Sequence, residues 1–514
     1  MHLTQSLHRN AQQDPDGIAT VYGDRTTTWA DSIARVARLA AGLRSLGVAE
    51  GDRVAILSLN SDRYHEYLFA TWWAGGVVNP VNVRWSPAEI AYSLEDSETK
   101  VLFADDTFAP AVAAIQAAAP VLTTVVHCGD GPTPEGMRSF GSLLDEGTIE
   151  DVRRGGDDLA GVFYTGGTTG FPKGVMLSHR NLLTSALGSA ATGDFVVPGG
   201  KLLHAAPMFH LADLASWVGR NLIGGGHVIV PMFTPDGVLE AIAKHGVTDA
   251  LLVPTMIQML VDAPGIAGAD LSSLQKIVYG GSPISEGLLD RVRRVLPGVR
   301  LAQAYGMTEL APVATMLREE EHADPVLRRS AGRAAPHALV KIVDVDDKEL
   351  PRGEVGEIVV SGDHVMLGYW GKPAETAAAV VDGWMHTGDG GRMDERGYVF
   401  VVDRIKDMIV SGGENVYSAE VESAATTHPA VAACAVIGVP DDEWGERVHA
   451  VVVLQPDAAL TLEELRAHCK ERIAGYKCPR SLELVDALPL SGAGKVLKRE
   501  LRARHWGDAE RSVN

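Results

Sequence analysis

Cysteine is scarce in this 514-residue chain, which has four cysteines and no C-x-x-C pair. We therefore expect neither a disulfide framework nor a zinc site, and the scarcity suits a reducing cytoplasm. Uncharged apolar runs long enough to span a membrane are absent, and the N-terminus MHLTQSLHRNAQQDPDG has no apolar core typical of a signal peptide. These absences predict a cytoplasmic protein with no integral membrane segment.

Positive charge is the second shortage. The 46 Lys and Arg residues face 66 Asp and Glu residues, which gives a formal net charge of −20 at pH 7. Because nucleic acids and anionic membranes are bound by basic surfaces, neither is expected as a main partner. A polyanionic small molecule must then be held by local groups against an unfavourable overall field.

The order of sequence patterns predicts an α/β protein with two domains. Over most of the first 400 residues, short apolar segments such as 53–59 alternate with helical patterns such as 31–48. The segments ALVKIVD, GEIVVSG and GYVFVVD that follow are typical of antiparallel strands. A smaller α+β unit then has strands at 431–439 and 448–454, and a helix at 461–473 that opens with a capping box. We predict a large multi-layer N-terminal domain over 1–403, a hinge over 404–407 and a C-terminal lid domain over 408–514.

The segment YTGGTTGFPKG at 164–174 is suited to binding phosphate. Its glycines let successive backbone N–H groups converge on an anion, its threonine hydroxyls add donors, and Lys173 adds a mobile charge. A strand-like stretch precedes it and a helical pattern follows from about residue 178, so we expect a strand–loop–helix frame. The pattern is not that of a P-loop NTPase, in which the lysine is followed by Ser or Thr. Here Lys173 is followed by Gly174, and Pro172 before it lacks a backbone N–H that could bind phosphate.

This segment resembles the phosphate-binding loop of the adenylate-forming superfamily, which holds acyl-CoA synthetases, luciferase-type enzymes and amino-acid adenylation domains. Gly166 stands where that family usually has serine. Further segments match the family's motifs in its order: PMFHL (207–211), YGGSP (279–283), QAYGMTE (303–309), WMHTGDGG (384–391), VVDRIKD (401–407), SGGENVYSAE (411–420) and LSGAGKVLKREL (490–501). The resemblance therefore covers the chain from about residue 160 to 500.

The resemblance implies a role for each matched residue. Tyr305 would stack on adenine, Thr308 would contact the α-phosphate of ATP, and Glu309 would help to hold Mg²⁺. Asp389 and Arg404 would bind the ribose, Lys406 would be the hinge residue, and residues 411–420 would line the channel for coenzyme A. Lys495 would bridge the substrate carboxylate and the α-phosphate, where a cation lowers the repulsion between two anions. The implied ATP-binding and cofactor-binding residues are Thr165, Gly166, Gly167, Thr168, Thr169, Gly170, Lys173, Gly281, Ser282, Ala304, Tyr305, Gly306, Thr308, Asp389, Arg404, Lys406, Gly412, Gly413 and Lys495. The implied catalytic residues are Lys495, Lys173, Thr165, Glu309 and His210, and the implied Mg²⁺ site contains Thr165 and Glu309.

The resemblance also places an acyl pocket, and its residues are mostly apolar. They are Phe209, His210, Trp217, Val253, Tyr279, Gly280, Gly281, Met307, Leu310, Ala311 and Met316. Arg and Lys are absent from this set, so a fatty acid or a bulky aryl or alicyclic acid is favoured over a dicarboxylate. Amino-acid adenylation domains carry an aspartate where this chain has His210, and Asp213 is out of register with that position, so an amino-acid substrate is not favoured.

These motifs predict an AMP-forming acid–thiol ligase. The carboxylate of a small-molecule acid would attack the α-phosphorus of ATP, and the thiol of coenzyme A would then displace AMP to give the acyl-CoA. The alternative is a carboxylate-adenylating enzyme with another acceptor, either a carrier-protein thiol or luciferase-like oxidation. A catalytically inactive nucleotide-binding module would be expected to lack Lys495 or Glu309, and both are present. A homodimer is compatible with the sequence.

Overall fold

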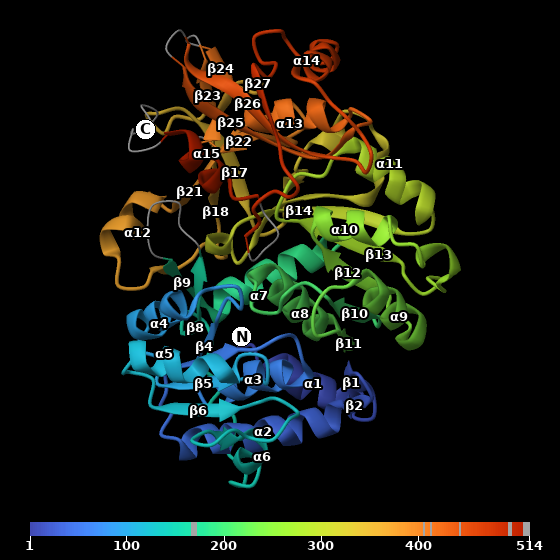
Figure 1. The fold of residues 1–514 in the computed structure, drawn as a ribbon. Helices are drawn as coiled ribbons and strands as arrows, with labels where there is room; N and C mark the ends of the chain where they lie inside the picture. The colour runs from blue at the N-terminus through green and yellow to red at the C-terminus, as the bar shows by residue number, and fades with distance from the viewer. Residues whose placement is uncertain (166–171, 405–406, 412–413, 442–443, 492–495, 507–514) are drawn as a thin grey trace.

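The computed structural model describes residues 1–165, 172–404, 407–411, 414–441, 444–491 and 496–506. A large N-terminal unit contains three sheets, and a smaller C-terminal unit is built on a fourth (Figure 1). The chain leaves the third sheet at Arg404 and enters the fourth at Ile409. A mixed α/β fold with a large first and a small second unit is confirmed, whereas the function of 404–407 as a hinge stays a prediction. Among the helices described, none is both long and apolar enough to cross a membrane.

The first sheet has a parallel centre and antiparallel edges. The apolar strands at its centre are buried on both faces, as is typical of a sheet covered by helices on both sides. The strand order is β16 (Arg333–Ala334), β15 (Val313–Leu317), β14 (Arg300–Gly306), β13 (Lys276–Gly280), β12 (Asp249–Leu252), β10 (Lys201–His204), β11 (Gly226–Ile229), β1 (Ile18–Tyr22) and β2 (Arg25–Thr28).

The second sheet is mostly parallel, and its antiparallel edge contains the described ends of the 164–174 motif. The strand order is β19 (Gly368–Tyr369), β9 (Lys173–Ser178), β8 (Leu159–Thr165), β4 (Val77–Pro80), β3 (Arg53–Leu57), β5 (Val101–Ala104), β6 (Thr124–His127) and β7 (Arg138–Ser139).

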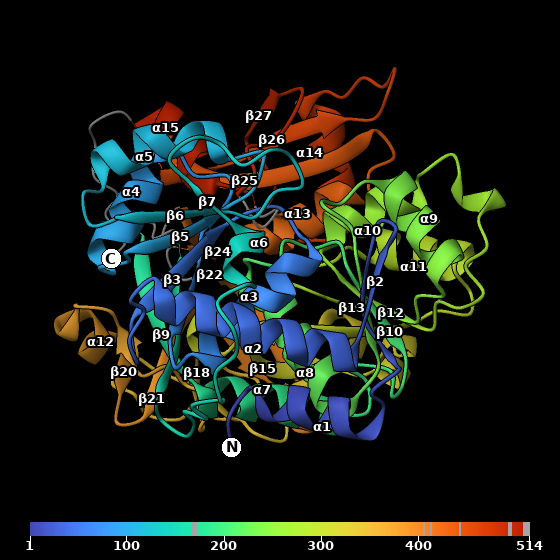
Figure 2. The same ribbon diagram turned by 90° about the horizontal axis from the view of Figure 1, so that it is seen from below.

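Helices fill the space between these two sheets and cover their outer faces. One hydrophobic cluster joins α1 (Gln5–Gln13), α2 (Trp29–Ser45), α3 (Asp62–Trp73), α7 (His179–Ala191) and α8 (Leu211–Ile223) to both sheets. The outer face of the first sheet is covered by α9 (Pro235–His245), α10 (Pro254–Val261) and α11 (Glu286–Val295). The outer face of the second sheet is covered by α4 (Pro87–Asp96) and α5 (Val112–Ala118), and Figure 2 shows these helices and α2 on opposite sides of β3, β5 and β6. The result is a layered sandwich.

The third sheet is antiparallel, as the sequence segments predicted. It contains β17 (Leu339–Val343), β18 (Val355–Ser361), β21 (Trp384–Met393), β20 (Val380–Val381) and β22 (Val399–Arg404). The short helix α6 (Phe140–Leu143) lies against α2 and adds Phe140 and Leu143 to the main hydrophobic cluster, and α12 (Pro373–Ala379) lies against β19 and β20.

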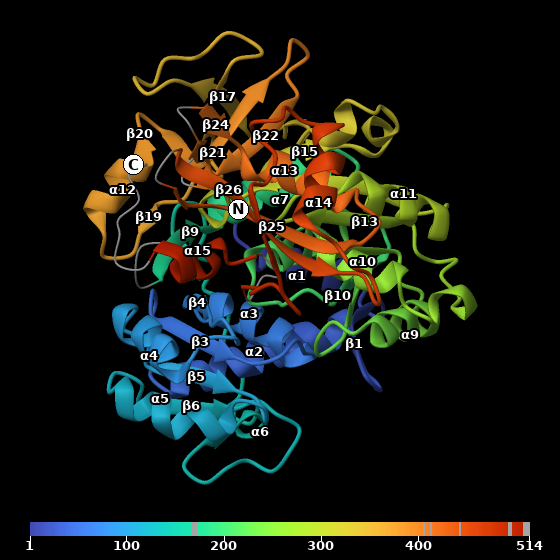
Figure 3. The same ribbon diagram turned by 45° about the horizontal axis from the view of Figure 1, so that its top comes forward.

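The C-terminal unit has its own sheet and core (Figure 3). Its strands are β24 (Glu414–Val416), β23 (Ile409–Ser411), β26 (Gly445–Leu454), β25 (Val431–Asp441) and β27 (Ser481–Leu484). The helices α13 (Ser418–Thr426) and α14 (Leu462–Lys470) pack on one face, and α15 (Lys498–Trp506) packs on the other. The predicted capping box is confirmed, because the Thr461 hydroxyl accepts from the backbone of Glu464 at 3.2 Å while the Glu464 side chain accepts from the backbone of Thr461.

The expected frame of the 164–174 motif was wrong in one respect. The motif joins two antiparallel strands, β8 and β9, and α7 begins only after β9 ends. Residues 175–178 form a strand because Val175 and Leu177 both point into the core, where each is fully buried, and β8 offers an open edge. Lys173 is therefore the first residue of a strand, which fixes its backbone more firmly than a loop would.

Candidate active site

Most of the predicted ligand-binding residues that the structure describes lie at strand ends, where the three N-terminal sheets meet. Thr165 ends β8 and Lys173 begins β9, while Tyr305 and Gly306 end β14 and Asp389 lies in β21. Five more of them lie at the ends of β13 and β14 or in the turns that follow: Gly280, Gly281, Ser282, Ala304 and Thr308. Strand ends of an α/β sheet are the usual edge for ligands.

Glycine at position 280 is required by the distance between two of these strands. A side chain at Gly280 would place its Cβ 2.3 Å from the carbonyl oxygen of Ala304, its partner in the parallel pairing of β13 and β14. Such a contact would push the strand ends apart. The glycine therefore lets two backbones of the predicted nucleotide site approach closely.

Tyr369 connects two residues that the motifs singled out. Its hydroxyl donates a hydrogen bond to Oε1 of Glu309 at 2.9 Å, and the Lys173 ammonium lies 5.0 Å from the centre of its ring. Burial, and then the negative charge of Glu309, raise the pKa of Tyr369, so its hydroxyl stays protonated and donates. Glu309 is 7% exposed, and its backbone carbonyl accepts from Met366 at 2.9 Å. The first and second sheets are thus linked at Glu309.

Tyr305 and Asp389 make the corresponding link between the first and third sheets. The Tyr305 hydroxyl donates to Oδ2 of Asp389 at 2.7 Å, and the Thr387 hydroxyl accepts from the Asp389 backbone at 3.1 Å. Asp389 also pairs with Arg404 in the register of β21 and β22. The structure therefore brings together the predicted adenine-stacking and ribose-binding residues, although their predicted contacts with ATP stay predictions.

Both ends of the 164–174 motif are held by the C-terminal end of α4. The Tyr164 hydroxyl donates to the Asp96 carboxylate at 2.6 Å, and the Trp370 indole donates to the Asp96 carbonyl at 2.9 Å. The backbone of Trp370 in turn donates to the Gly174 carbonyl at 2.8 Å. Both described ends of the motif are therefore attached to Asp96 of α4, one of the helices that cover the second sheet.

The C-terminal unit returns to this side of the N-terminal unit. The carbonyl of Ser491 accepts from Nη1 of Arg84 at 3.0 Å, and the neighbouring Trp85 ring makes an edge contact with Tyr164, with ring centres 6.5 Å apart. Leu490 and Val496 form an antiparallel bridge. The described residues on either side of Lys495 are therefore anchored close to the start of the 164–174 motif.

Five of the predicted acyl-pocket residues lie in one hydrophobic cluster. Phe209, Trp217, Met307, Leu310 and Ala311 belong to the same hydrophobic cluster, which also includes Tyr305. Trp217 is 1% exposed, and its indole donates to His65 at 3.1 Å. His210 caps α8, where its Nδ1 accepts from the backbone of Ala212 at 3.3 Å. That these residues contact an acyl group stays a prediction.

Two sequence interpretations need correction. Tyr279 points away from the cluster of Phe209 and Met307, because alternate residues of β13 face opposite sides of the sheet. It packs instead among α9, α10 and α11, and its hydroxyl lies 2.9 Å from Nε2 of His322. Asp213, considered as a partner for a substrate ammonium, is 1% exposed and lies 2.7 Å from Nδ1 of His204. It is a structural residue of the core.

Nine of the predicted residues lie outside the part of the chain that the structure describes. They are Gly166, Gly167, Thr168, Thr169, Gly170, Lys406, Gly412, Gly413 and Lys495. Their roles stay predictions. Conversely, Tyr369, Trp370, Asp96 and Arg84 were not predicted from the motifs, because their importance depends on contacts between distant parts of the chain. The aromatic pair Tyr369-Trp370, between a glycine and another glycine, was the one local signal.

The comparisons with known proteins agree with this geometry. The family described as AMP-binding enzyme matches residues 7–370, and the AMP-binding enzyme C-terminal domain matches residues 420–495. A feruloyl-CoA synthase from Amycolatopsis sp is 42% identical, covering 96% of this chain and 97% of its own. The fatty acid–[acyl-carrier-protein] ligase ScoC of Streptomyces coeruleorubidus is 39% identical, covering 100% of this chain and 98% of its own. The crystal structure of ATP-bound MatB from Rhodopseudomonas palustris superposes with a TM-score of 0.89 at 32% identity, covering 99% of this chain and 100% of that one. The chain therefore belongs to the AMP-binding enzyme family, as an AMP-forming acyl-CoA synthetase of the adenylate-forming superfamily.

Proposed function

We propose that this enzyme activates an apolar carboxylic acid, either aryl or fatty, as its acyl-adenylate and transfers the acyl group to coenzyme A. The observation that carries the proposal is that the three N-terminal sheets meet at Glu309, Tyr305 and Asp389. The Lys173 ammonium lies there over the ring of Tyr369. Contacts between these side chains, which the motifs predict to bind nucleotide and anion, support the proposal. The apolar cluster of Phe209, Met307, Leu310 and Ala311 adjoins it.

In the first step, an oxygen of the substrate carboxylate attacks the α-phosphorus of ATP, and pyrophosphate leaves. Thr165 and Lys173 would hold the phosphates of ATP, and Tyr305 and Asp389 would orient the adenosine. Lys495 would bring the two anions together as charge develops on the α-phosphate. A carboxylate is a suitable oxygen ligand for Mg²⁺, so Glu309 with Thr165 would hold that ion, which would neutralise phosphate charge when bound.

In the second step, the thiol of coenzyme A attacks the acyl carbonyl, and AMP leaves. We propose that residues 404–407 form a hinge between an N-terminal domain over 1–403 and a C-terminal lid over 408–514. Rotation there would withdraw the Lys495 segment and bring residues 411–420 to the site. The contact between Arg84 and Ser491 would have to break in that motion.

The choice of acid rests on the apolar cluster and on the relatives. The feruloyl-CoA synthase is named for an aryl acid, and ScoC is named for a fatty acid. A dicarboxylate would need a cation among the pocket residues, and the predicted set contains none. Aryl and medium- or long-chain fatty acids are therefore the classes to test first.

The test is pyrophosphate release by the full-length enzyme with ATP, Mg²⁺ and a panel of acids, each with and without coenzyme A. Ferulate or a fatty acid should give acid-dependent pyrophosphate and, with coenzyme A, the matching thioester. Malonate and an amino acid should give neither. Pyrophosphate release that is independent of any acid, or confined to the amino acid, would contradict the proposal.

A carrier-protein thiol is the second candidate acceptor, and the full-length similarity to ScoC favours including it. Replacing coenzyme A with a phosphopantetheinylated acyl-carrier protein distinguishes the two. We expect coenzyme A to be acylated faster, because no partner protein must then dock on the lid. Faster acylation of the carrier protein would show that the carrier protein, and not coenzyme A, is the preferred acceptor of the acyl group.

Tyr369 should act as a positioning residue for Glu309. Tyr369→Phe keeps the ring beside Lys173 and removes the hydrogen bond to Glu309, so we expect kcat for pyrophosphate release to fall about tenfold. The Mg²⁺ concentration for half-maximal rate should rise, because the carboxylate is less well oriented. The control is Tyr398→Phe, which removes a hydrogen bond to Glu321 away from the site. An unchanged Mg²⁺ requirement in Tyr369→Phe would show that the tyrosine is only structural.

A further inference from the structure

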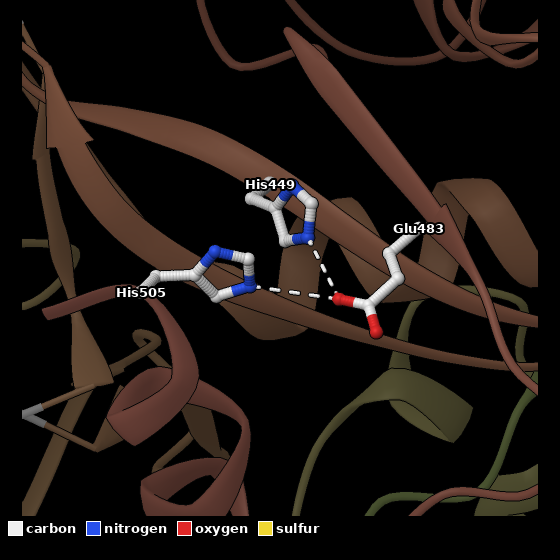
Figure 4. A group of neighbouring side chains, drawn as sticks. All are labelled: His449, Glu483 and His505. Atoms are coloured by element: carbon white, nitrogen blue, oxygen red, sulfur yellow. Dashed lines mark ion pairs between the residues drawn. The ribbon is translucent and has the colours of Figure 1, made fainter. Parts of the chain in front are cut away.

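Two histidines and a glutamate converge in the C-terminal unit (Figure 4). His449 comes from β26, Glu483 from β27 and His505 from α15, so the group joins two adjacent strands to the last described helix. Nε2 of His449 lies 3.6 Å, and Nε2 of His505 lies 3.5 Å, from the same oxygen, Oε2 of Glu483. All three ligand atoms lie within 4.8 Å of one another.

The imidazole of His449 is held in the orientation that a metal ligand needs. Its Nδ1 lies 2.7 Å from the Ser481 hydroxyl, while its Nε2 faces the carboxylate and has no hydrogen-bond partner. The side chain is only 7% exposed. A buried nitrogen without a partner is costly, and a bound cation would satisfy it.

The two nitrogen–oxygen distances in this group are longer than direct hydrogen bonds and match the spacing of ligand atoms around a small divalent ion. Both nitrogen–oxygen separations exceed the usual hydrogen-bond range of about 2.7–3.2 Å. Ligand atoms about 2.0–2.2 Å from a tetrahedral zinc ion lie roughly 3.3–3.5 Å from each other. Arg504 pairs with the other oxygen of Glu483, Oε1, at 3.4 Å. Oε2 therefore faces both imidazoles.

We propose that His449, Glu483 and His505 bind one Zn²⁺ ion that fastens α15 to β26 and β27. Two imidazoles and one carboxylate are a zinc ligand set, and a water molecule would take the fourth position on the side where Glu483 and His505 are partly exposed. Counting cysteines could not reveal this site, because none of its ligands is a cysteine.

The ion would hold one end of a helix whose other end is already fixed. Lys498, at the start of α15, lies 2.7 Å from Glu422 of α13. Lys495 precedes this helix by three residues in the sequence. Zinc at His505 would therefore stabilise the element from which the Lys495 segment extends, without taking part in the acyl-transfer chemistry.

The test is isothermal titration of chelator-treated full-length enzyme with ZnCl₂, with MgCl₂ as the control cation. The wild type should bind one equivalent of Zn²⁺ and should not bind Mg²⁺ at this site, because Mg²⁺ prefers oxygen ligands. His505→Ala and Glu483→Gln should each weaken zinc binding at least about tenfold. Both positions are partly exposed, so these variants should fold, and the shape-conserving Glu483→Gln checks this independently. Zinc should raise the Tm of the wild type but not of the two variants.

The matched control is His468→Ala. His468 pairs with His428 in the same unit, with ring centres 4.9 Å apart, but this pair is not among the three-residue ligand groups of the described chain. Its zinc affinity should equal that of the wild type. Loss of the zinc equivalent only in His468→Ala would overturn the proposal, as would no stoichiometric zinc binding by the wild type or undiminished binding by both ligand variants. Those results would leave the group as an ion-paired cluster. Because binding and Tm are measured without substrate, failure here is distinguishable from failure of the proposed ligase activity.

Discussion

Replacing Lys495 with alanine should reduce acid-dependent pyrophosphate release at least about 100-fold, while thioester formation from supplied acyl-adenylate and coenzyme A should remain near the wild-type rate. The first step brings a carboxylate against a triphosphate in a protein of net charge −20, so a cation between the two anions has a large effect. In the second step, the thiol attacks an uncharged carbonyl. The loss should therefore be confined to one half-reaction.

The position of the neighbouring residues supports this expectation. Ser491 is hydrogen-bonded to Arg84, and Arg84 adjoins Trp85, which contacts Tyr164 at the start of the phosphate motif. Ser491, four residues before Lys495 in the sequence, thus contacts the N-terminal unit close to the start of the phosphate motif.

The control for Lys495→Ala is Arg499→Ala. Arg499 is an exposed cation four residues further along, so its removal changes the net charge equally without removing the proposed bridging group. Arg499→Ala should release pyrophosphate and form the thioester at the rates of the wild type. If Lys495→Ala still releases pyrophosphate normally with a competent acid, the assigned adenylation mechanism is wrong. If both half-reactions fall together, Lys495 has a structural role instead.

The motifs predicted the family and the order of the elements because these depend on local sequence. A glycine-rich turn with hydroxyls and a lysine has few uses other than binding an anion, and its neighbours in the sequence repeat the superfamily's order. The antiparallel strands of the third sheet were likewise predictable from short apolar segments separated by glycine, aspartate and proline. Thr461 and Glu464 fixed the start of α14 through their spacing alone.

Contacts between distant segments were not predictable in this way. Tyr369 bonds to Glu309, sixty residues earlier, only because β19 pairs with β9 beside the phosphate motif. The face on which Tyr279 lies was set by the register of β13 in its sheet, which the sequence of YGGSP does not reveal. The strand–loop–helix prediction omits β9, because its apolar residues form a run too short to identify as a strand without the partner strand β8.

Replacing Glu309 with glutamine should lower kcat for pyrophosphate release about 100-fold and raise the Mg²⁺ concentration needed for half-maximal rate. The amide keeps the size of the side chain and can still accept a hydrogen bond from Tyr369, so the link between the first and second sheets should survive. The substitution removes the negative charge of the carboxylate, and Mg²⁺ prefers carboxylate ligands. The measurement is the rate of pyrophosphate release at saturating acid over a range of Mg²⁺ concentrations.

A double variant that combines Glu309→Gln with Tyr369→Phe then distinguishes the effect of the Glu309 charge from the effect of the orientation of its side chain. Since the hydroxyl of Tyr369 is expected to act only by orienting the carboxylate, its removal should cost much less in Glu309→Gln than in the wild type. Glu320→Gln is the matched control, because Glu320 is an exposed carboxylate paired with Arg318 on the surface, and its rate and Mg²⁺ requirement should not change. A Glu309→Gln enzyme with normal Mg²⁺ dependence would exclude Glu309 as an ion ligand. Independent, additive losses in the double variant would instead show that Tyr369 acts on the reaction through another group, and Lys173, which lies against its ring, would be the first residue to examine.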